Sequence, residues 1–163
     1  MNQVKHLQTK ILSFTALEGQ LEKWRNTNQK IVFTNGCFDL LHFGHVDYLA
    51  KARDMGDRLV VGLNTDASIR RIKGSSRPIK DEQSRLALLA GMAFVDAVVL
   101  FDEETPINLI SMISPDVLVK GGDYEVKDIV GHEIVLNNKG KVCTIDFVDG
   151  YSSSSLIEKV KTS

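Results

Sequence analysis

The stretch "KIVFTNGCFDLLHFGHVDYL", residues 30–49, decides the fold of this chain. It begins with an apolar, β-branched run that ends at Asn35-Gly36, and it closes with apolar residues at helical spacing. A buried strand followed directly by an amphipathic helix is the first unit of an α/β sheet. Between the two elements stand His42 and His45. Whether these histidines bind a metal, bind an anion or pack depends on what surrounds them.

The rest of the chain repeats the same alternation of short apolar runs and helical patterns. The runs lie at 30–34, 58–63, 97–100, 116–120 and 141–145. Helical patterns lie at 16–28, 43–55, 82–92, 106–113 and 129–138, and after the serines at 152–155. This order predicts a Rossmann-like α/β fold, with a five-stranded parallel sheet and helices on both faces. We expect a single domain over residues 1–163, with residues 1–29 as an N-terminal helical extension packed on it.

Composition limits the class of protein. The 163 residues are 43% hydrophobic and 25% charged, as in one globular domain with a core. A net charge of -1 gives no broad basic surface for nucleic acid. No apolar run approaches the ~18 residues of a membrane helix, and the first ten residues lack a signal-peptide segment. The sequence therefore predicts a cytoplasmic protein without membrane contact, with Cys37 and Cys143 as reduced thiols.

Four unusual segments follow the ends of predicted strands. They lie at 34–49, 64–78, 120–124 and 149–155. In an open parallel sheet, ligands bind beyond the carboxyl ends of the strands, near the point where strand order reverses. We therefore expect these segments to meet at one edge of the sheet and form one site.

The histidine pair favours phosphate binding. If His42 begins the helix, His42 and His45 share one face. Free amides and the positive end of the helix dipole would then act together with the imidazoles, and Gly44 would let a phosphate reach the backbone. Two histidines supply only two metal ligands, and no third ligand has metal-like spacing. Asp39 could face a metal carried by a nucleotide or cap the turn.

A basic segment follows the second predicted strand. It contains Arg70, Arg71, Lys73 and Arg77. A loop on the ligand side of the sheet could wrap a polyphosphate with such residues, and we expect Lys73 to contact phosphate. The alternative is an ordinary solvated surface. Arg85, on the next helix, could reach the same phosphates or pair on the surface with Asp81 or Glu82.

Two further segments suit a nucleotide. Gly121-Gly122 would let a flat base lie against bare backbone, and Asp123 could accept hydrogen bonds from ribose hydroxyls. An ordinary glycine turn is the alternative. The serines at 152–155 are interpreted as the start of the last helix, because Ser155 and Glu158 fit a capping box. A flexible serine loop is the alternative.

These residues also carry a resemblance to a known superfamily. "TNGCFDLLHFGH", residues 34–45, is similar to the T-x-G-x-F-D-x-x-H-x-G-H signature of the HxGH nucleotidyltransferases, and "DGYSSSSLI", residues 149–157, resembles their C-terminal signature. The strings "IKGSSRPI", "LVKGGDY" and "IVGHEIV" further resemble adenylyltransferases that make ADP-heptose. The resemblance covers residues 12–160 and implies a nucleotidyltransferase fold.

The resemblance implies transfer of AMP from ATP to D-glycero-β-D-manno-heptose 1-phosphate, with Mg²⁺ held mainly by the nucleotide phosphates. It implies catalytic roles for His42, His45 and Lys73. The residues expected along the nucleotide are Phe33, Thr34, Asn35, Gly36, Phe38, Asp39, Gly44, Lys120, Gly121, Gly122, Asp123, Ser152, Ser153, Ser154 and Ser155. Near the acceptor we expect Asp66, Arg77 and Arg85. A separate sugar kinase would supply the acceptor, and a homodimer is possible.

Two alternatives stay open. Cytidylyltransferases of glycerol 3-phosphate and similar small phosphates resemble the chain too, but they usually carry an arginine where Phe147 stands here. A non-catalytic nucleotide-binding module would keep the fold without the reaction. The presence of both histidines and Lys73 argues against such a module.

Overall fold

A parallel five-stranded sheet forms the centre of the molecule. The computed structural model describes residues 2–122 and 124–162. The strands are β1 (Ile31–Gly36), β2 (Arg58–Asn64), β3 (Ala97–Phe101), β4 (Val117–Gly121) and β5 (Lys141–Ile145). They pair in the order β3-β2-β1-β4-β5, and every pairing is parallel. The predicted sheet is therefore confirmed, and strand order reverses between β1 and β4.

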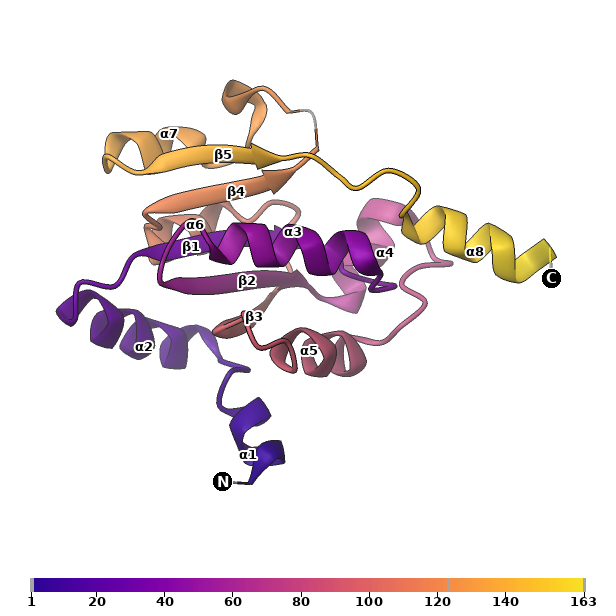
Figure 1. Ribbon diagram of the computed structural model, residues 1–163, viewed down its shortest axis with the longest axis horizontal. Coiled ribbons are helices and arrows are strands. Elements are labelled where there is room, and N and C mark those ends of the chain that lie inside the picture. The colour runs from indigo at the N-terminus through magenta and orange to yellow at the C-terminus, as the bar shows by residue number, and fades with distance from the viewer. Residues whose placement is uncertain (1, 123, 163) are drawn as a thin grey trace.

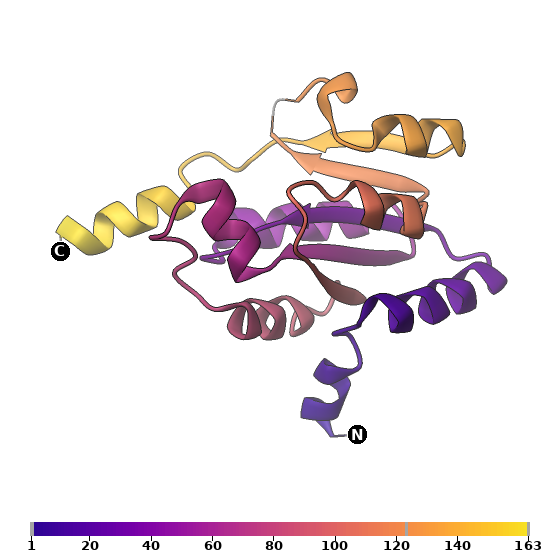
Figure 2. The same ribbon diagram turned by 180° about the vertical axis from the view of Figure 1, so that it is seen from behind.

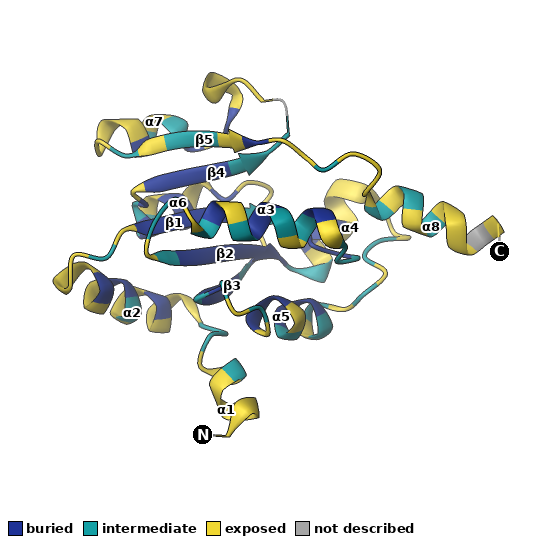
Figure 3. Ribbon diagram, viewed as in Figure 1, coloured by how far each residue is buried: buried dark blue, intermediate teal, exposed yellow. Residues whose placement is uncertain are grey.

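Helices cover both faces of this sheet (Figures 1 and 2). One face carries α3 (Phe43–Arg53) and α5 (Glu82–Ala90), and α1 (Gln3–Gln8) packs against α5. The opposite face carries α2 (Phe14–Asn26), α6 (Ile107–Ile113) and α7 (His132–Asn137). Successive side chains of β1 enter opposite cores, Val32 the first and Phe33 the second. Figure 3 shows that β1, β2 and β4 are largely buried, which explains their apolar sequences, whereas the edge strand β5 is partly exposed.

The strands β1 and β4 separate toward their carboxyl ends. Their paired residues are Val32 with Val117 and Phe33 with Leu118, and both strands continue past these pairs. Tyr48 of α3 lies across the gap: its hydroxyl donates to the Val119 carbonyl at 3.2 Å and lies 2.6 Å from Thr34 Oγ1. The gap between these strands is the crevice expected at the switch point of such a sheet.

The basic segment differs from its prediction. Arg70, Arg71 and Lys73 lie on a helix, α4 (Asp66–Lys73), and not in a loop. The Thr65 side chain caps this helix by accepting from the Ser68 amide, and Gly74, with φ of 90°, ends it. Only Ser68 and Ile69 of the helix are buried, so its apolar pattern is too short to recognise in the sequence.

Helix boundaries differ at two other places. The helix predicted at 129–138 is present but shorter, as α7 (His132–Asn137), and a 3-10 turn, η1 (Val126–Asp128), precedes it. The last helix, α8 (Ser153–Thr162), has its capping contact at Ser152, whose hydroxyl accepts from the Ser155 amide at 3.1 Å. The capping box predicted at Ser155 is therefore wrong by three residues. Figure 1 shows α8 projecting past the carboxyl edge of the sheet.

Two other expectations concern the whole chain. Cys37 and Cys143 are both free, as predicted. Within residues 2–122 and 124–162, no helix is long and apolar enough to cross a membrane.

Candidate functional site

A cleft with two lobes lies at the carboxyl ends of β1 and β4. The histidine lobe has a volume of about 260 Å³ and is lined by Phe38, Asp39, His45, Tyr48, Arg77, Gly121, Phe147 and Ser153. The acidic lobe has a volume of about 480 Å³ and is lined by Asn64, Ile72, Glu104, Thr105, Pro106, Leu118, Asp128, Ile129 and Val130. Both lobes share Asn35, Gly36, Cys37, Lys73, Lys120 and Tyr124. All four segments predicted at this edge contribute side chains.

The two histidines stand together at the start of α3. His42 is the N-cap residue, with extended backbone and no capping hydrogen bond from its side chain. Its ring stacks on that of His45, with centroids 3.9 Å apart, and Phe38 packs edge-on against His45 at 5.4 Å. Both Nδ1 atoms are buried and have no hydrogen-bond partner. Because a buried polar atom without a partner is costly, these atoms point to a ligand that would satisfy them.

The environment keeps these imidazoles neutral. Burial, together with His42 and Lys73 nearby, lowers the pKa of His45 to about 4, and burial also lowers the pKa of His42. A neutral imidazole can donate one hydrogen bond to a phosphate oxygen. Gly44 follows His42 on the helix, and a Cβ there would lie 3.1 Å from the His42 ring. A side chain at this position would therefore require the His42 ring to shift by a few tenths of an ångström.

The neutral state of His45 predicts that its imidazole titrates at an unusually low pH. An NMR titration of the free protein should give His45 a pKa of about 4, below the ordinary 6.5. The native state then binds fewer protons than the unfolded state between these values, so stability should fall as pH falls through this range. A bound triphosphate favours the imidazolium and should raise this pKa, so nucleotide should bind more tightly as pH falls. A free-protein pKa at or above 6.5 would contradict this account.

Two lysines stand where the lobes join. Lys73 ends α4, where it lies close enough to His45 to lower that residue's pKa. Lys120 lies on β4, and its Nζ is 6.0 Å from the centre of the Tyr124 ring. Burial lowers the pKa of Lys120. The junction therefore presents two amines to any anion in the cleft. Lys73 lies at the predicted edge of the sheet, although on a helix and not in a loop.

Asp39 holds the segment that follows α4. Its carboxylate accepts from the Ile79 and Lys80 amides, at 2.8 and 2.9 Å, and pairs with Arg77 at 3.1 Å. The Asp39 side chain is 2% exposed. Of the two roles considered for Asp39, the structure supports the structural one, since both carboxylate oxygens have protein partners. Arg77 borders the histidine lobe but is held by this ion pair.

The prediction of an acceptor contact for Arg85 is wrong. Arg85 is 0% exposed, and it pairs with Asp66 at 2.7 Å instead of with Asp81 or Glu82. Its guanidinium also donates to the carbonyls of Cys37, Asn64 and Lys80. A fully buried guanidinium with four protein partners cannot contact substrate. One carboxylate oxygen of Asp66 forms this ion pair. Because Asp66 begins α4 and Arg85 lies on α5, the pair joins the two helices beneath the cleft.

Two residues of β1 also lie outside the cleft. Phe33 and Thr34 are fully buried and line neither lobe, so their predicted contact with nucleotide is corrected. Phe33 belongs to the core beneath the sheet, and Thr34 bonds to Tyr48. Burial of Tyr48 raises its pKa to about 12, so its hydroxyl stays protonated. Asn35 and Gly36, the next two residues of β1, do line the cleft.

The glycine turn after β4 meets an aromatic side chain. A Cβ at Gly121 would lie 2.6 Å from the Phe147 ring, so the absence of a side chain lets Phe147 cover this backbone. Gly122 has φ of 99°, a left-handed conformation that favours glycine. Asp123, expected near ribose, lies outside the described residues. Sequence reasoning noted Phe147 only as a departure from a signature, but it lines the histidine lobe beside Gly121.

One of the four serines faces the cleft. Ser153 lines the histidine lobe, and its hydroxyl donates to the Leu40 carbonyl at 3.2 Å. Ser152 and Ser155 bond to each other across the first turn of α8, and neither they nor Ser154 line a lobe. The Phe43 and Tyr151 rings lie 5.2 Å apart, so the starts of α3 and α8 are neighbours.

Metal binding by side chains has no support in the described part of the chain. Among those residues, no group of three or more histidine, cysteine or acidic side chains could hold a metal ion. The histidine pair has aromatic and basic neighbours in place of further ligands. The arrangement suits an anion better than a zinc ion.

A five-stranded parallel sheet covered by helices on both faces is the architecture of nucleotidyltransferase-like α/β proteins. The chain belongs to the cytidylyltransferase-like family, which matches residues 33–159. Its enzyme class is therefore that of the nucleotidyltransferases, which act on a nucleoside triphosphate.

Individual relatives agree with this family. "Bifunctional protein HldE" of Citrifermentans bemidjiense is 52% identical over 159 residues, covering 98% of this chain and 33% of that protein. The protein of the same name from Campylobacter concisus is 57% identical over 133 residues, covering 82% of this chain and 27% of that protein. This chain thus spans about a third of the length of the curated relatives it matches.

A solved structure has a similar fold. The lipopolysaccharide core biosynthesis protein of Thermoplasma volcanium superposes with a TM-score of 0.61 at 29% sequence identity. The superposition covers 76% of this chain and 99% of that structure.

Proposed function

We propose that this chain transfers AMP from ATP to D-glycero-β-D-manno-heptose 1-phosphate, forming ADP-heptose and pyrophosphate. The observation that carries the proposal is the stacked pair of His42 and His45, with buried, unpartnered Nδ1 atoms beside Lys73. Donors arranged in this way suit the charge that develops on a reacting triphosphate. The heptose assignment is supported by the sequence strings described above and by the similarity of most of this chain to one part of longer relatives named bifunctional protein HldE.

The proposed reaction depends on positioning the sugar phosphate and ATP, and it needs no strong general base. A sugar phosphate has a second pKa of about 6, so its attacking oxygen is already largely ionised at neutral pH. That oxygen attacks the α-phosphorus of ATP, a new P–O bond forms, and the bond to the β-phosphate bridge breaks as pyrophosphate leaves. His42, His45 and Lys73 would stabilise charge on the α-phosphate and the leaving group. Mg²⁺ would arrive bound to the nucleotide phosphates. Asn35, Gly36, Phe38, Lys120, Gly121 and Ser153 would line the nucleotide, while Gly44 and Gly122, which line neither lobe, would shape the backbone beside it.

The proposal has consequences for the protein's context. A kinase activity must supply the sugar 1-phosphate, because the reaction starts from a phosphorylated sugar. The use of ATP favours the cytoplasm as its compartment.

A pyrophosphate-release assay tests the nucleotide and the acceptor together. With Mg²⁺ and heptose 1-phosphate, ATP should support turnover at least about 10-fold faster than CTP, which corresponds to roughly 1.4 kcal/mol of discrimination. Preference for CTP with glycerol 3-phosphate would replace the proposal with a cytidylyltransferase. Binding of ATP without transfer to any sugar 1-phosphate would favour a non-catalytic module.

A further inference from the structure

We propose that the acidic lobe binds the acceptor, a phosphate monoester of a polyhydroxylated molecule, with Glu104 and Asp128 as its specificity-determining residues. The phosphate would lie at the junction of the lobes and the hydroxyl groups at the far wall. This inference rests on the proposed function and adds where, and by which contacts, the acceptor is recognised.

The first support is the way in which the lobes are joined. Asn35, Gly36 and Cys37 form a common wall, and Lys73 and Lys120 stand at the same junction. A triphosphate held by His45 places its α-phosphorus near this junction. In phosphoryl transfer the attacking and leaving oxygens lie roughly in line, so the acceptor approaches from the side opposite to the pyrophosphate. We place the acceptor in the acidic lobe because it shares this junction but is not lined by His45, which would hold the triphosphate.

The second support is the charge distribution along the acidic lobe. At the junction, two amines face a phosphate that carries about -1.5 to -2 charges at neutral pH. Glu104 and Asp128 line the acidic lobe but not the histidine lobe, and we call this unshared part the far wall; they come from different segments, the loop after β3 and η1. Within residues 2–122 and 124–162, neither carboxylate has an ion-pair partner or a hydrogen-bond partner. Their oxygens are therefore available to accept from hydroxyl groups.

The same carboxylates disfavour other ligands. Two negative charges at the far wall would repel a second phosphate, so the lobe selects a ligand that is anionic at one end and neutral at the other. The Thr105 hydroxyl adds a donor and acceptor beside Glu104. Apolar side chains line the rest, among them Ile72 and Ile129, which suits the C–H faces of a sugar ring. A volume of about 480 Å³ lies within the usual range for a small-molecule site.

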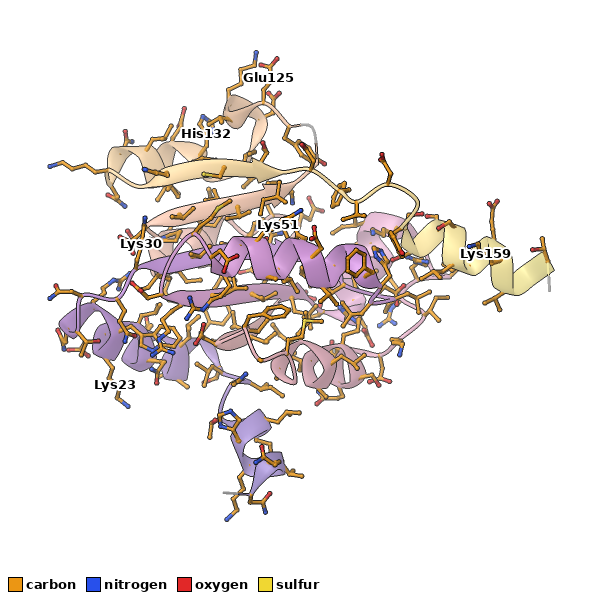
Figure 4. The ribbon with its side chains drawn as sticks, in the orientation of Figure 1. Lys23, Lys30, Lys51, Glu125, His132 and Lys159 are labelled. Carbon is orange, nitrogen blue, oxygen red and sulfur yellow. The ribbon has the colours of Figure 1, made fainter. Side chains whose placement is uncertain are left out.

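Kinetics of two isosteric variants test this assignment. Glu104→Gln and Asp128→Asn should each raise KM for heptose 1-phosphate by about 10-fold, since each replaces a charged acceptor of a substrate hydroxyl with a weaker neutral one. KM for ATP should stay unchanged. The matched control is Glu125→Gln, because Glu125 is 71% exposed, pairs with Lys127 and points outward from the η1 segment (Figure 4). Unchanged acceptor KM in both variants, or a raised KM for ATP, would overturn the assignment.

A steric variant and a binding measurement separate this inference from the proposed function. Val130→Trp places bulk in the lobe at a residue that is 41% exposed, so folding should be retained. Calorimetry with a non-hydrolysable ATP analogue present should show that heptose 1-phosphate binds to the native protein and about 10-fold more weakly to Val130→Trp. Binding with this loss but without turnover would support the lobe and overturn the transfer reaction. Turnover with unchanged acceptor affinity in Val130→Trp would overturn the lobe and leave the reaction standing.

Discussion

Replacing His45 with alanine is expected to lower kcat for AMP transfer by about 10²–10³-fold, the usual effect of removing one donor from a charge-stabilising site. The expectation follows from the position of the ring: it stacks on His42, borders the histidine lobe and has a buried Nδ1 without a partner. Since the contact strengthens as charge develops, the loss should fall on kcat more than on KM for ATP. Steady-state pyrophosphate release measures both constants.

Controls for this variant are available within the chain. His6→Ala removes an exposed histidine of α1 and should leave turnover unchanged. His45→Asn keeps a hydrogen-bonding group near the Nδ1 position and should retain part of the activity. A folded His45→Ala protein with the turnover of the native protein would exclude the proposed role of this histidine.

Features carried by one continuous segment could be predicted from the sequence. The strands were recognisable because both faces of the sheet are covered, which makes the central strands nearly continuous apolar runs; the edge strand β5 is apolar at Val142, Cys143 and Ile145 although partly exposed. The histidine pair was recognisable because one strand end and one helix start place both rings at the sheet edge. The parallel order then brought the remaining segments to the same edge, which is how Lys73, Lys120 and Ser153 could be placed.

Features built from several segments could not be predicted. Charge patterning suggested a surface position for Arg85, whereas its partners come from three other segments, at Cys37, Asn64 and Asp66. The acidic lobe likewise depends on how the loop at Glu104 faces η1, and neither segment has a distinctive sequence. Such features depend on contacts between residues far apart in the sequence, which hydrophobic periodicity and motif spacing do not reveal.

The burial of Arg85 predicts the largest effect on stability. Arg85→Ala should lower the free energy of unfolding by about 3–5 kcal/mol, the range for breaking a buried charge pair from one side. The substitution leaves the carbonyls of Cys37 and Asn64 without their donor and Asp66 without its counter-ion, and it opens a cavity at a 0% exposed position. Urea unfolding measures the change as a lower midpoint at unchanged slope.

Comparison with other substitutions identifies the cause. Arg85→Lys keeps the charge but loses the planar fork that reaches several acceptors, so it should also destabilise, by less than alanine does. Arg70→Ala, on the exposed side of α4, should change stability by no more than about 0.5 kcal/mol. Because Arg85 ties the end of β1 to the end of β2 and to Lys80, its loss should also loosen both lobes of the cleft and raise KM for ATP and acceptor together. An Arg85→Ala protein as stable as Arg70→Ala would show that these four contacts contribute little to folding.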